Sequence, residues 1–248
     1  MSEVYAVIGG SGLYSLDESF RIESSQKPNT PYGEVSAELI IGEMKGYRTV
    51  FLPRHGSSHH IPPHKINYRA NLWALRELKV SHVIAVNAVG GIDFKPRSLV
   101  LPDQIIDYTS DRSHTYFDGE GSEVDHIDFS LPYSQPLREK ILTAGKTRGI
   151  TIHTPGTYGC TNGPRLESSA EIQKMQRDGC NIIGMTGMPE AALARELNME
   201  YAAITMVVNW CSGITASVLD MDEIRQILDS GMNSVNELIG ATLRQAEQ

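Results

Sequence analysis

The sequence predicts an α/β fold in which one central twisted sheet, mostly parallel or mixed, is flanked by helices. Two observations carry this prediction. Short apolar runs rich in β-branched residues alternate along the chain with segments of helical spacing. The first apolar run opens directly into a glycine-rich loop, as is common in α/β proteins. No linker-like or low-complexity stretch divides the 248 residues, so we expect one domain spanning 1–248.

The N-terminal stretch VYAVIGGSGL, residues 4–13, supplies the first strand and this loop. Its first half combines β-branched and small residues and predicts a buried strand. Gly9, Gly10 and Gly12 allow the backbone to turn sharply with its N–H groups pointing one way, and Ser11 adds a hydroxyl donor. The loop therefore predicts a phosphate site, with a purely structural turn as the alternative.

Hydrophobic periodicity and turn residues predict the remaining elements in order. The first half predicts a hairpin of strands 37–41 and 48–52 that leads to PRHG, a helix over 68–78, strands over 82–89 and 104–108, and a long functional loop over 111–131. The second half predicts a helix ending near Gly149, extended structure over 152–158, a turn at 162–164, a helix over 168–178, a strand over 180–185, a helix starting at Pro189 and a strand over 201–208. A C-terminal helix follows, with a capping-box pattern at Asp220 and Glu223.

Polar residues stand where the predicted strands end. The residues at these strand ends are Ser11, Arg54, His55, Asn87, Ala88, Met185, Thr186, Asn209 and Trp210, with Met185 expected in a pocket rather than in the core. Because the carboxyl ends of parallel strands meet at one edge of a sheet, we expect these residues to surround one phosphate. The alternatives are an ordinary ion pair for Arg54 and a helix cap for Thr186.

Composition excludes several classes of partner. The net charge of -8 argues against a nucleic-acid or anionic membrane surface. Cys160, Cys180 and Cys211 form no CxxC pair and fit a reduced compartment. No apolar run approaches the roughly 18 residues needed to span a bilayer, and the N-terminus does not read as a leader. We therefore expect a cytoplasmic protein without a membrane partner.

The sequence argues against two kinds of cofactor site, a metal site and a dinucleotide site. His55, His59, His60 and His64 have helical i, i+4 spacings, but the glycine and prolines among them oppose a helix and no carboxylate lies nearby, so we expect no metal. The motif GSGLYS lacks the final glycine of a dinucleotide fingerprint, and no helical periodicity follows it. We therefore expect neither NAD nor another cofactor.

Six motifs together resemble one family. They are GGSGL at 9–13, PRHG at 53–56, HKINYRANLWAL at 64–75, NAVGG at 87–91, NGPRLESSAE at 162–171 and GMTGMPE at 184–190. The sequence resembles the trimeric class of purine nucleoside phosphorylases, and most closely its methylthioadenosine phosphorylase branch. This resemblance implies a nucleoside phosphorylase-like fold and reversible phosphorolysis, with inorganic phosphate as co-substrate, a purine nucleoside as substrate, and a homotrimer with sites at subunit interfaces.

The resemblance also implies roles for individual residues. The phosphate-binding positions match Ser11, Arg54, His55, Ala88 and Thr186, and the substrate-binding positions match His59, Leu166, Met185 and Val208. Asn87 matches a position in the phosphate-side turn, and His126 matches a residue that the family lends to the 5′ pocket of a neighbouring subunit. Ser57 replaces an arginine of some members, which leaves Arg54 as the main cation near the phosphate.

The base-facing strand departs from the methylthioadenosine branch, which carries two aspartates there. This chain has Asn209 and Cys211 instead, and Asn209 matches the asparagine of phosphorylases that act on inosine and guanosine. Glu167 stands where those enzymes carry a glutamate that accepts a hydrogen bond from N1–H. The resemblance therefore implies catalytic roles for Asn209 and Glu167 toward a hypoxanthine-type base. The alternatives are a strand-end amide and a solvated charge at a helix start.

The residues after Asn209 indicate which group the pocket would accept at the 5′ position of the substrate. Ile214, Val218 and Leu219 are apolar, and no histidine matches the one that inosine-cleaving members use for a 5′-hydroxyl. An apolar pocket suits a methylthio group, because an unpaired buried hydroxyl costs about 1–3 kcal/mol. The residues expected to face the base and those expected to face the 5′ group together imply phosphorolysis of S-methyl-5′-thioinosine. The alternatives are a general inosine/guanosine phosphorylase, a methylthioadenosine phosphorylase and a nucleoside-binding protein without catalysis.

Overall fold

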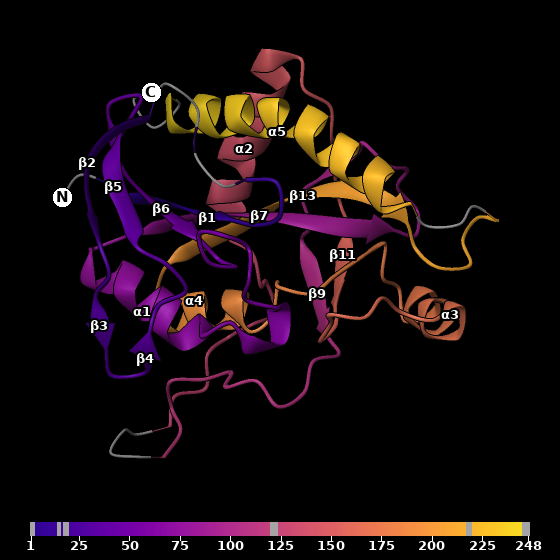
Figure 1. Cartoon of the computed structure of the whole chain (residues 1–248), viewed down its shortest axis with the longest axis horizontal. Coiled ribbons are helices and arrows are strands. Elements are labelled where there is room, and N and C mark those ends of the chain that lie inside the picture. The colour runs from indigo at the N-terminus through magenta and orange to yellow at the C-terminus, as the bar shows by residue number, and fades with distance from the viewer. Residues whose placement is uncertain (1–2, 14–15, 17–19, 120–123, 217–219, 245–248) are drawn as a thin grey trace.

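A mixed sheet forms the centre of the molecule, with helices on both of its faces (Figure 1). The computed structural model describes residues 3–13, 16, 20–119, 124–216 and 220–244. Its strands are β1 Tyr5–Gly9, β2 Phe20–Gln26, β5 Leu39–Met44, β6 Tyr47–Pro53, β7 His82–Gly91, β8 Leu99–Val100, β9 Gln104–Asp107, β10 Ile152–His153, β11 Thr157–Cys160, β12 Ile182–Gly184 and β13 Glu200–Trp210. A small separate hairpin pairs β3 Asn29–Thr30 with β4 Gly33–Glu34.

The helices cover the sheet in two layers. They are α1 Tyr68–Glu77, α2 Gln135–Arg148, α3 Ser169–Arg177, α4 Glu190–Glu196 and α5 Met221–Arg244, with a short 3₁₀ turn at Pro63–Lys65. In Figure 1, α2 and α5 lie over one face, whereas α1 and α4 lie over the other. The predicted α/β class is confirmed. Among the described residues, no helix combines the length and the apolar composition that crossing a membrane requires.

The main path through the sheet runs β10-β8-β13-β7-β1-β6-β5-β2. β1 pairs in parallel with both β6 and β7, and β13 pairs in parallel with β7. The predicted hairpin is confirmed as the antiparallel pair β5 and β6, although β5 begins and ends later than expected. The pair β7 with β12 is also antiparallel, which makes the sheet mixed. The parallel strands β1, β6 and β7 therefore end at a common edge, as predicted.

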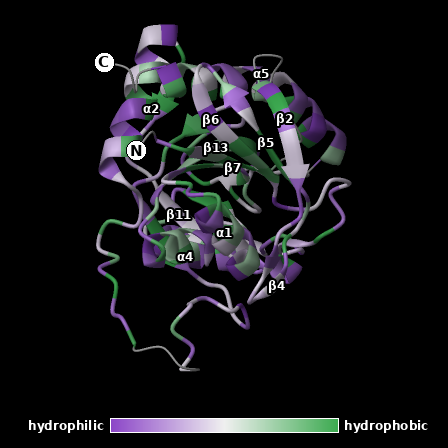
Figure 2. Ribbon diagram, turned by 90° about the vertical axis from the view of Figure 1, so that its left-hand side faces the viewer, coloured by the Kyte–Doolittle hydropathy of each residue, from purple (hydrophilic) through white to green (hydrophobic). Residues whose placement is uncertain are grey.

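The core is divided by the sheet into two hydrophobic layers. Along β1, Ala6 and Ile8 belong to the layer beneath α1 and α4, whereas Tyr5 and Val7 belong to the layer beneath α2 and α5. This alternation follows from the two-residue period of a strand. Because both faces are covered, β1 is buried at every position, and Figure 2 shows the hydrophobic strands enclosed between helices.

Two helix termini show how local sequence sets the boundaries. Gly149 follows α2 in a left-handed conformation, with φ of 67°, and ends the helix where predicted. The complete capping box lies at α3, where Ser168 and Glu171 exchange hydrogen bonds. At the expected capping position before α5, the Asp220 carboxylate accepts from the Asp222 amide instead. The described parts of the predicted loop 111–131 contain no helix or strand, as expected.

Candidate active site

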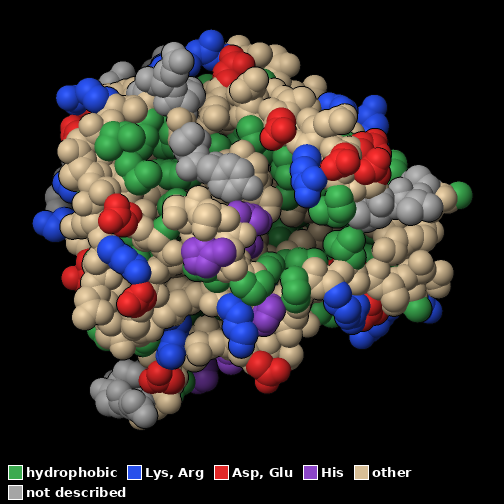
Figure 3. Space-filling model, viewed as in Figure 1, with side chains coloured by type: hydrophobic (Ala, Val, Ile, Leu, Met, Phe, Trp, Pro, Cys, Tyr) green, Lys and Arg blue, Asp and Glu red, His purple; other side chains and the backbone are tan. Residues whose placement is uncertain are grey.

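A cavity of about 590 Å³ lies where the ends of the central strands meet. All the residues to which the family resemblance gave a binding or catalytic role, except His126, line it, namely Ser11, Arg54, His55, His59, Ala88, Leu166, Glu167, Met185, Thr186, Val208 and Asn209. Trp210, which was expected with the other strand ends, does not line this cavity. Figure 3 shows the hollow on one face of the molecule, with histidine and hydrophobic side chains gathered around it. The expected convergence of the strand ends is therefore present. One detail differs, because Asn87 and Ala88 lie inside β7, which continues to Gly91 along β13.

The glycine loop follows β1 and packs tightly against its neighbours. A Cβ atom on Gly10 would lie 2.4 Å from the Val86 carbonyl oxygen and 3.0 Å from Arg54 Nη1, so no side chain fits there. Gly12 has a φ of 85°, which favours glycine. The Ser11 hydroxyl lies 3.4 Å from His59 Nε2. The loop thus brings Ser11 to the cavity beside the PRHG segment.

Arg54 forms an ion pair, as in the alternative considered for it, but the pair is buried rather than exposed. Its Nε and Nη2 donate to the two carboxylate oxygens of Glu190 at 2.7 and 2.8 Å, and its Nη1 donates to the Val86 carbonyl at 3.1 Å. Both side chains are fully buried, and the Tyr201 hydroxyl also donates to Glu190. Burial alone would lower the pKa of Arg54, but Glu190 raises it above its usual value. Arg54 therefore reaches the cavity wall as half of a neutral pair rather than as a free cation.

His55 is neutral and has one tautomer. Its Nδ1 lies 2.9 Å from the Ile61 carbonyl oxygen, which can only accept, so Nδ1 carries the proton and Nε2 is an acceptor. Burial and then the charge of Arg54 lower the pKa of His55 to about 4. The rings of His55 and His59 lie 4.5 Å apart between centroids, and burial lowers the pKa of His59. The imidazoles therefore add no net charge to this end of the cavity near neutral pH.

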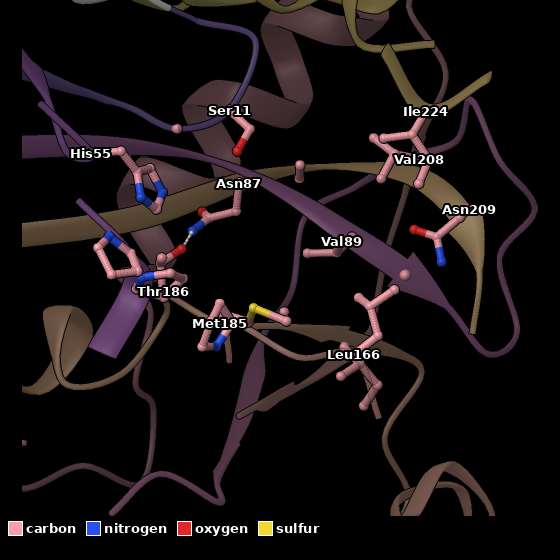
Figure 4. Close-up of a pocket in the computed structure, with 18 of the residues that line it drawn as sticks. Ser11, His55, Asn87, Val89, Leu166, Met185, Thr186, Val208, Asn209 and Ile224 are labelled. Atoms are coloured by element: carbon pink, nitrogen blue, oxygen red, sulfur yellow. Dashed lines mark hydrogen bonds between the residues drawn. The ribbon is translucent and has the colours of Figure 1, made fainter. Parts of the chain in front are cut away.

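Asn87 and Thr186, which both line the cavity, form a hydrogen bond with each other. Asn87 Nδ2 donates to Thr186 Oγ1 at 2.7 Å, and both residues are buried (Figure 4). Asn87 was assigned only to the phosphate-side turn, so its bond to Thr186 is new. It joins two residues 99 positions apart in the chain.

Asn209 and Glu167 lie at the other end of the cavity. Asn209 Nδ2 donates to the Trp210 carbonyl at 2.8 Å, and Glu167 accepts from the Thr161 hydroxyl at 2.6 Å. Cys211 is buried beside them, and burial together with the charge of Glu167 raises its thiol pKa to about 12. This end thus carries one amide, one carboxylate and an un-ionised thiol.

The apolar residues near Asn209 differ from those expected. Met221 and Ile224, in the first turns of α5, line the cavity, and Figure 4 shows Ile224 beside Val208. Ile214 was expected here, but it packs against a separate cluster because its amide bonds back to the Cys211 carbonyl in a turn. Val218 and Leu219 lie outside the described residues. Met221 and Ile224 were missed because their helical spacing also fits an ordinary core-facing stripe.

His126 is another predicted residue that the structure places away from the cavity. It is exposed, on the described part of the long loop that follows β9. Its neighbours Val124 and Leu131 are each more than 60% exposed, at 63% and 61%. Its predicted contact with a second subunit is not described by a single chain.

The chain is similar to known proteins over nearly its whole length. A protein of Pseudomonas syringae pv. tomato named "Probable S-methyl-5'-thioinosine phosphorylase" is 49% identical over 242 residues, which is 97% of this chain and 98% of that protein. The 6-oxopurine nucleoside phosphorylase of Pyrococcus furiosus is 42% identical over 96% of this chain and 91% of its own. A crystal structure of a methylthioadenosine phosphorylase from an antarctic soil metagenomic library superposes with a TM-score of 0.91 at 34% identity, covering 98% of this chain and 85% of that one.

The family profile described as "Phosphorylase superfamily" matches residues 4–244. This span includes every element from β1 to α5 and every residue of the cavity. The resemblance identified from the sequence motifs is thereby confirmed. The chain belongs to the phosphorylase superfamily.

Proposed function

We propose that this chain catalyses the reversible phosphorolysis of S-methyl-5′-thioinosine to hypoxanthine and 5-methylthioribose 1-phosphate. The observation that carries the proposal is the pairing, in one cavity, of Asn209 and Glu167 with the apolar side chains of Met221 and Ile224. The polar pair suits a 6-oxopurine, and the apolar pair suits a methylthio tail. Relatives named for this activity, such as the Pseudomonas syringae protein, support the same reading.

In this reaction a phosphate oxygen bonds to C1′ of the sugar as the C1′–N9 bond breaks. The bonding pair leaves with the purine, which takes a proton at N7, and positive charge develops on the sugar between two anionic groups. Stabilising these charges requires donors and acceptors already aimed at them. We assign Ser11, Arg54, His55, Ala88 and Thr186 to phosphate, and His59, Met185, Leu166 and Val208 to the nucleoside.

The hydrogen bonds of the free site fit these roles. Because one Nδ2 proton of Asn209 is bound to the Trp210 carbonyl, its Oδ1 remains to accept from protonated N7 and its second Nδ2 proton to donate to O6. The Thr161 hydroxyl occupies one Glu167 oxygen, and the other is left to accept from N1–H. Asn209 and Glu167 are therefore the proposed catalytic residues.

The proposal includes an assembly and a location. We assign a homotrimer in which His126, on its exposed loop, enters the 5′ pocket of a neighbouring subunit. The exposed apolar side chains of Val124 and Leu131 on either side of His126 support an interface there. The three cysteines are buried and unpaired, which supports a reducing compartment, the cytoplasm. The reaction needs phosphate as co-substrate and, in this proposal, no cofactor.

The test is phosphate-dependent release of free base from S-methyl-5′-thioinosine, S-methyl-5′-thioadenosine and inosine, measured side by side on the purified protein. We expect kcat/KM to favour methylthioinosine by at least tenfold, which is about 1.4 kcal/mol of transition-state preference. A preference for methylthioadenosine would overturn the roles of Asn209 and Glu167. Saturable binding of nucleoside without phosphate-dependent release of base would show instead that the chain is a nucleoside-binding protein without catalytic activity.

A general 6-oxopurine nucleoside phosphorylase is the second candidate. The base-facing pair Asn209 and Glu167 would suit its substrates equally well, and the Pyrococcus furiosus relative carries that name. The two candidates differ only at the 5′ end. Equal turnover of inosine and methylthioinosine would favour the general enzyme, because the apolar side chains would then give no preference.

A further inference from the structure

Arg112 is a buried arginine that bridges the two segments following β11 and β12. It is 9% exposed and does not itself line the cavity. Its Nη2 donates to the carbonyl oxygens of Thr161 and Asn162 at 3.3 and 3.0 Å. Its Nη1 donates to the Met188 carbonyl oxygen and, at 3.2 Å, to the Tyr68 hydroxyl. One guanidinium group thus holds the backbone of both segments.

Both segments carry residues of the cavity and pack on each other. Residues 161–167 contribute Glu167, and residues 185–188 contribute Met185, which Figure 4 shows among the cavity side chains. Gly163 has a φ of 60°, and a Cβ atom there would overlap Met185 Sδ, so the first segment lies directly against the second. A shift of either segment would therefore move side chains of the site.

Thr161 connects Arg112 to Glu167. The Thr161 carbonyl accepts from Arg112, and the Thr161 hydroxyl donates to Glu167 Oε1 at 2.6 Å. Hydrogen bonds from a charged donor are stronger than those between neutral groups, so Arg112 restrains the Thr161 backbone more firmly than a neutral donor would. A side chain whose support is fixed in this way keeps its orientation before the ligand arrives.

The loop that carries Arg112 is itself anchored to two helices. Thr115 Oγ1 and the Tyr116 amide both donate to the Glu196 carboxylate at 2.7 Å. The Tyr116 hydroxyl donates to the Arg69 carbonyl at 2.8 Å. Glu196 is the last residue of α4 and Arg69 lies in α1, so the loop is fixed to the helical layer. Arg112 therefore restrains the two cavity segments rather than following them.

We propose that Arg112 is a positioning residue that acts through Thr161 and holds the Glu167 carboxylate where it accepts from N1–H of a 6-oxopurine. The inference rests on the proposed function, which assigns Glu167 to the base. Adenine has no proton on N1, and the N1 lone pair would face a carboxylate oxygen. A Glu167 held in place therefore favours hypoxanthine over adenine, whereas a Glu167 that can turn away tolerates both bases.

The test measures the dissociation constants of hypoxanthine and adenine on the whole chain, by calorimetry at a constant phosphate concentration. The unaltered chain should bind hypoxanthine at least about tenfold more tightly than adenine. In Arg112→Met this preference should fall by at least about threefold, because Glu167 is no longer held. The matched control is Arg138→Met, since Arg138 is also buried and donates to the backbone carbonyls of Leu101 and Pro102. None of these three residues lines the cavity, so the control should leave the preference unchanged.

A double variant separates positioning from a general weakening of the fold. Glu167→Gln should lower the preference by itself, and adding Arg112→Met should then change it by less than about twofold, because both substitutions remove the same interaction. An equal loss of affinity for the two bases in Arg112→Met would overturn the proposal. Losses of preference that add in the double variant, or a similar loss in Arg138→Met, would also overturn it.

Arg112→Lys decides the matter if Arg112→Met fails to fold. Lysine keeps the charge but lacks the planar fork that reaches both segments. The preference for hypoxanthine should therefore fall in Arg112→Lys as well, and an unaltered preference would overturn the proposal.

The outcome is separate from that of the proposed function. A preference that falls in Arg112→Met, in a chain that releases base from no nucleoside, would overturn the function alone. Release of hypoxanthine from methylthioinosine, with a preference that Arg112→Met does not alter, would overturn the role of Arg112 alone. Equal binding of the two bases by the unaltered chain would overturn the role of Arg112 together with the assignment of Glu167.

Discussion

The two ends of the cavity are built differently. At the phosphate end, Arg54, Asn87 and Thr186 are buried, and their bonds join segments up to 136 residues apart in the chain. At the base and 5′ end, Leu166 and Met221 are 46% and 54% exposed, and among the described residues the Asn209 side-chain amide bonds only to Trp210. The phosphate end is thus part of the core, whereas the nucleoside end is attached to its surface.

This difference has a physical consequence. A group held by core contacts cannot be changed without a loss of stability, because its partners are left buried and unpaired. A group on the rim can change at little cost to the fold. Substitutions should therefore lower stability at the phosphate end and alter substrate choice at the nucleoside end.

The largest effect should come from the buried ion pair. Arg54→Met leaves the fully buried Glu190 without its counter-charge and should lower the free energy of unfolding by about 3–5 kcal/mol. Urea denaturation measures this loss. The matched control is Arg21→Met, because the Arg21–Glu43 pair is exposed and its loss should cost less than about 1 kcal/mol. Equal losses in the two variants would remove the distinction between core and rim.

The next effect should fall on catalysis without affecting stability. Asn209→Ala should lower kcat/KM for 6-oxopurine nucleosides by about 100- to 1,000-fold, because a donor and acceptor for the departing base is lost. The free energy of unfolding should change by less than about 0.5 kcal/mol, since within the part of the chain that the structure describes the side chain bonds only to the Trp210 carbonyl. Asn209→Asp should shift preference toward the 6-aminopurine. A large loss of stability in either variant would show that this end is also core.

Lowering the pH should lower the free energy of unfolding, because His55 at the phosphate end is buried in its neutral form. Unfolded His55 binds a proton near its ordinary pKa of 6.5, whereas the native residue remains neutral until about pH 4. The unfolded state therefore holds more protons between these values, and stability falls as pH falls, by up to about 1.4 kcal/mol per pH unit for this one group. Denaturation at a series of pH values should show a shallower decline for His55→Gln. An unchanged slope would contradict the lowered pKa.

The smallest effect should come from the 5′ end. Met221→Ala should reduce the preference for methylthioinosine over inosine by about fivefold, or ~1 kcal/mol, because the half-exposed side chain contributes only part of its apolar area. Ratios of kcat/KM for the two substrates measure this change. Ile22→Ala, at an exposed apolar position on the remote strand β2, serves as the control and should leave the ratio unaltered.

Much of this arrangement was predictable from local patterns. Alternating apolar runs located β1, β6, β7 and β13, and the glycine loop and PRHG were expected at one edge of the sheet, where they lie. The pairing of Arg54 with Glu190 was not predictable, because nothing near either residue marks the other. Met221 and Ile224 were missed for a related reason. Their spacing predicts a helix face but not whether that face meets the core or a cavity.

The sequence by itself determined the α/β class, the order of the elements, the family and the residue types available for phosphate and a 6-oxopurine. These depend on properties that each segment carries alone, namely hydrophobic period, turn residues and motif spacing. Only the tertiary structure decided that Arg54 is neutralised, that His55 is a neutral acceptor and that Asn87 bonds to Thr186. Charge balance, tautomer and hydrogen-bond satisfaction depend on which distant groups packing brings together, so no local pattern contains them.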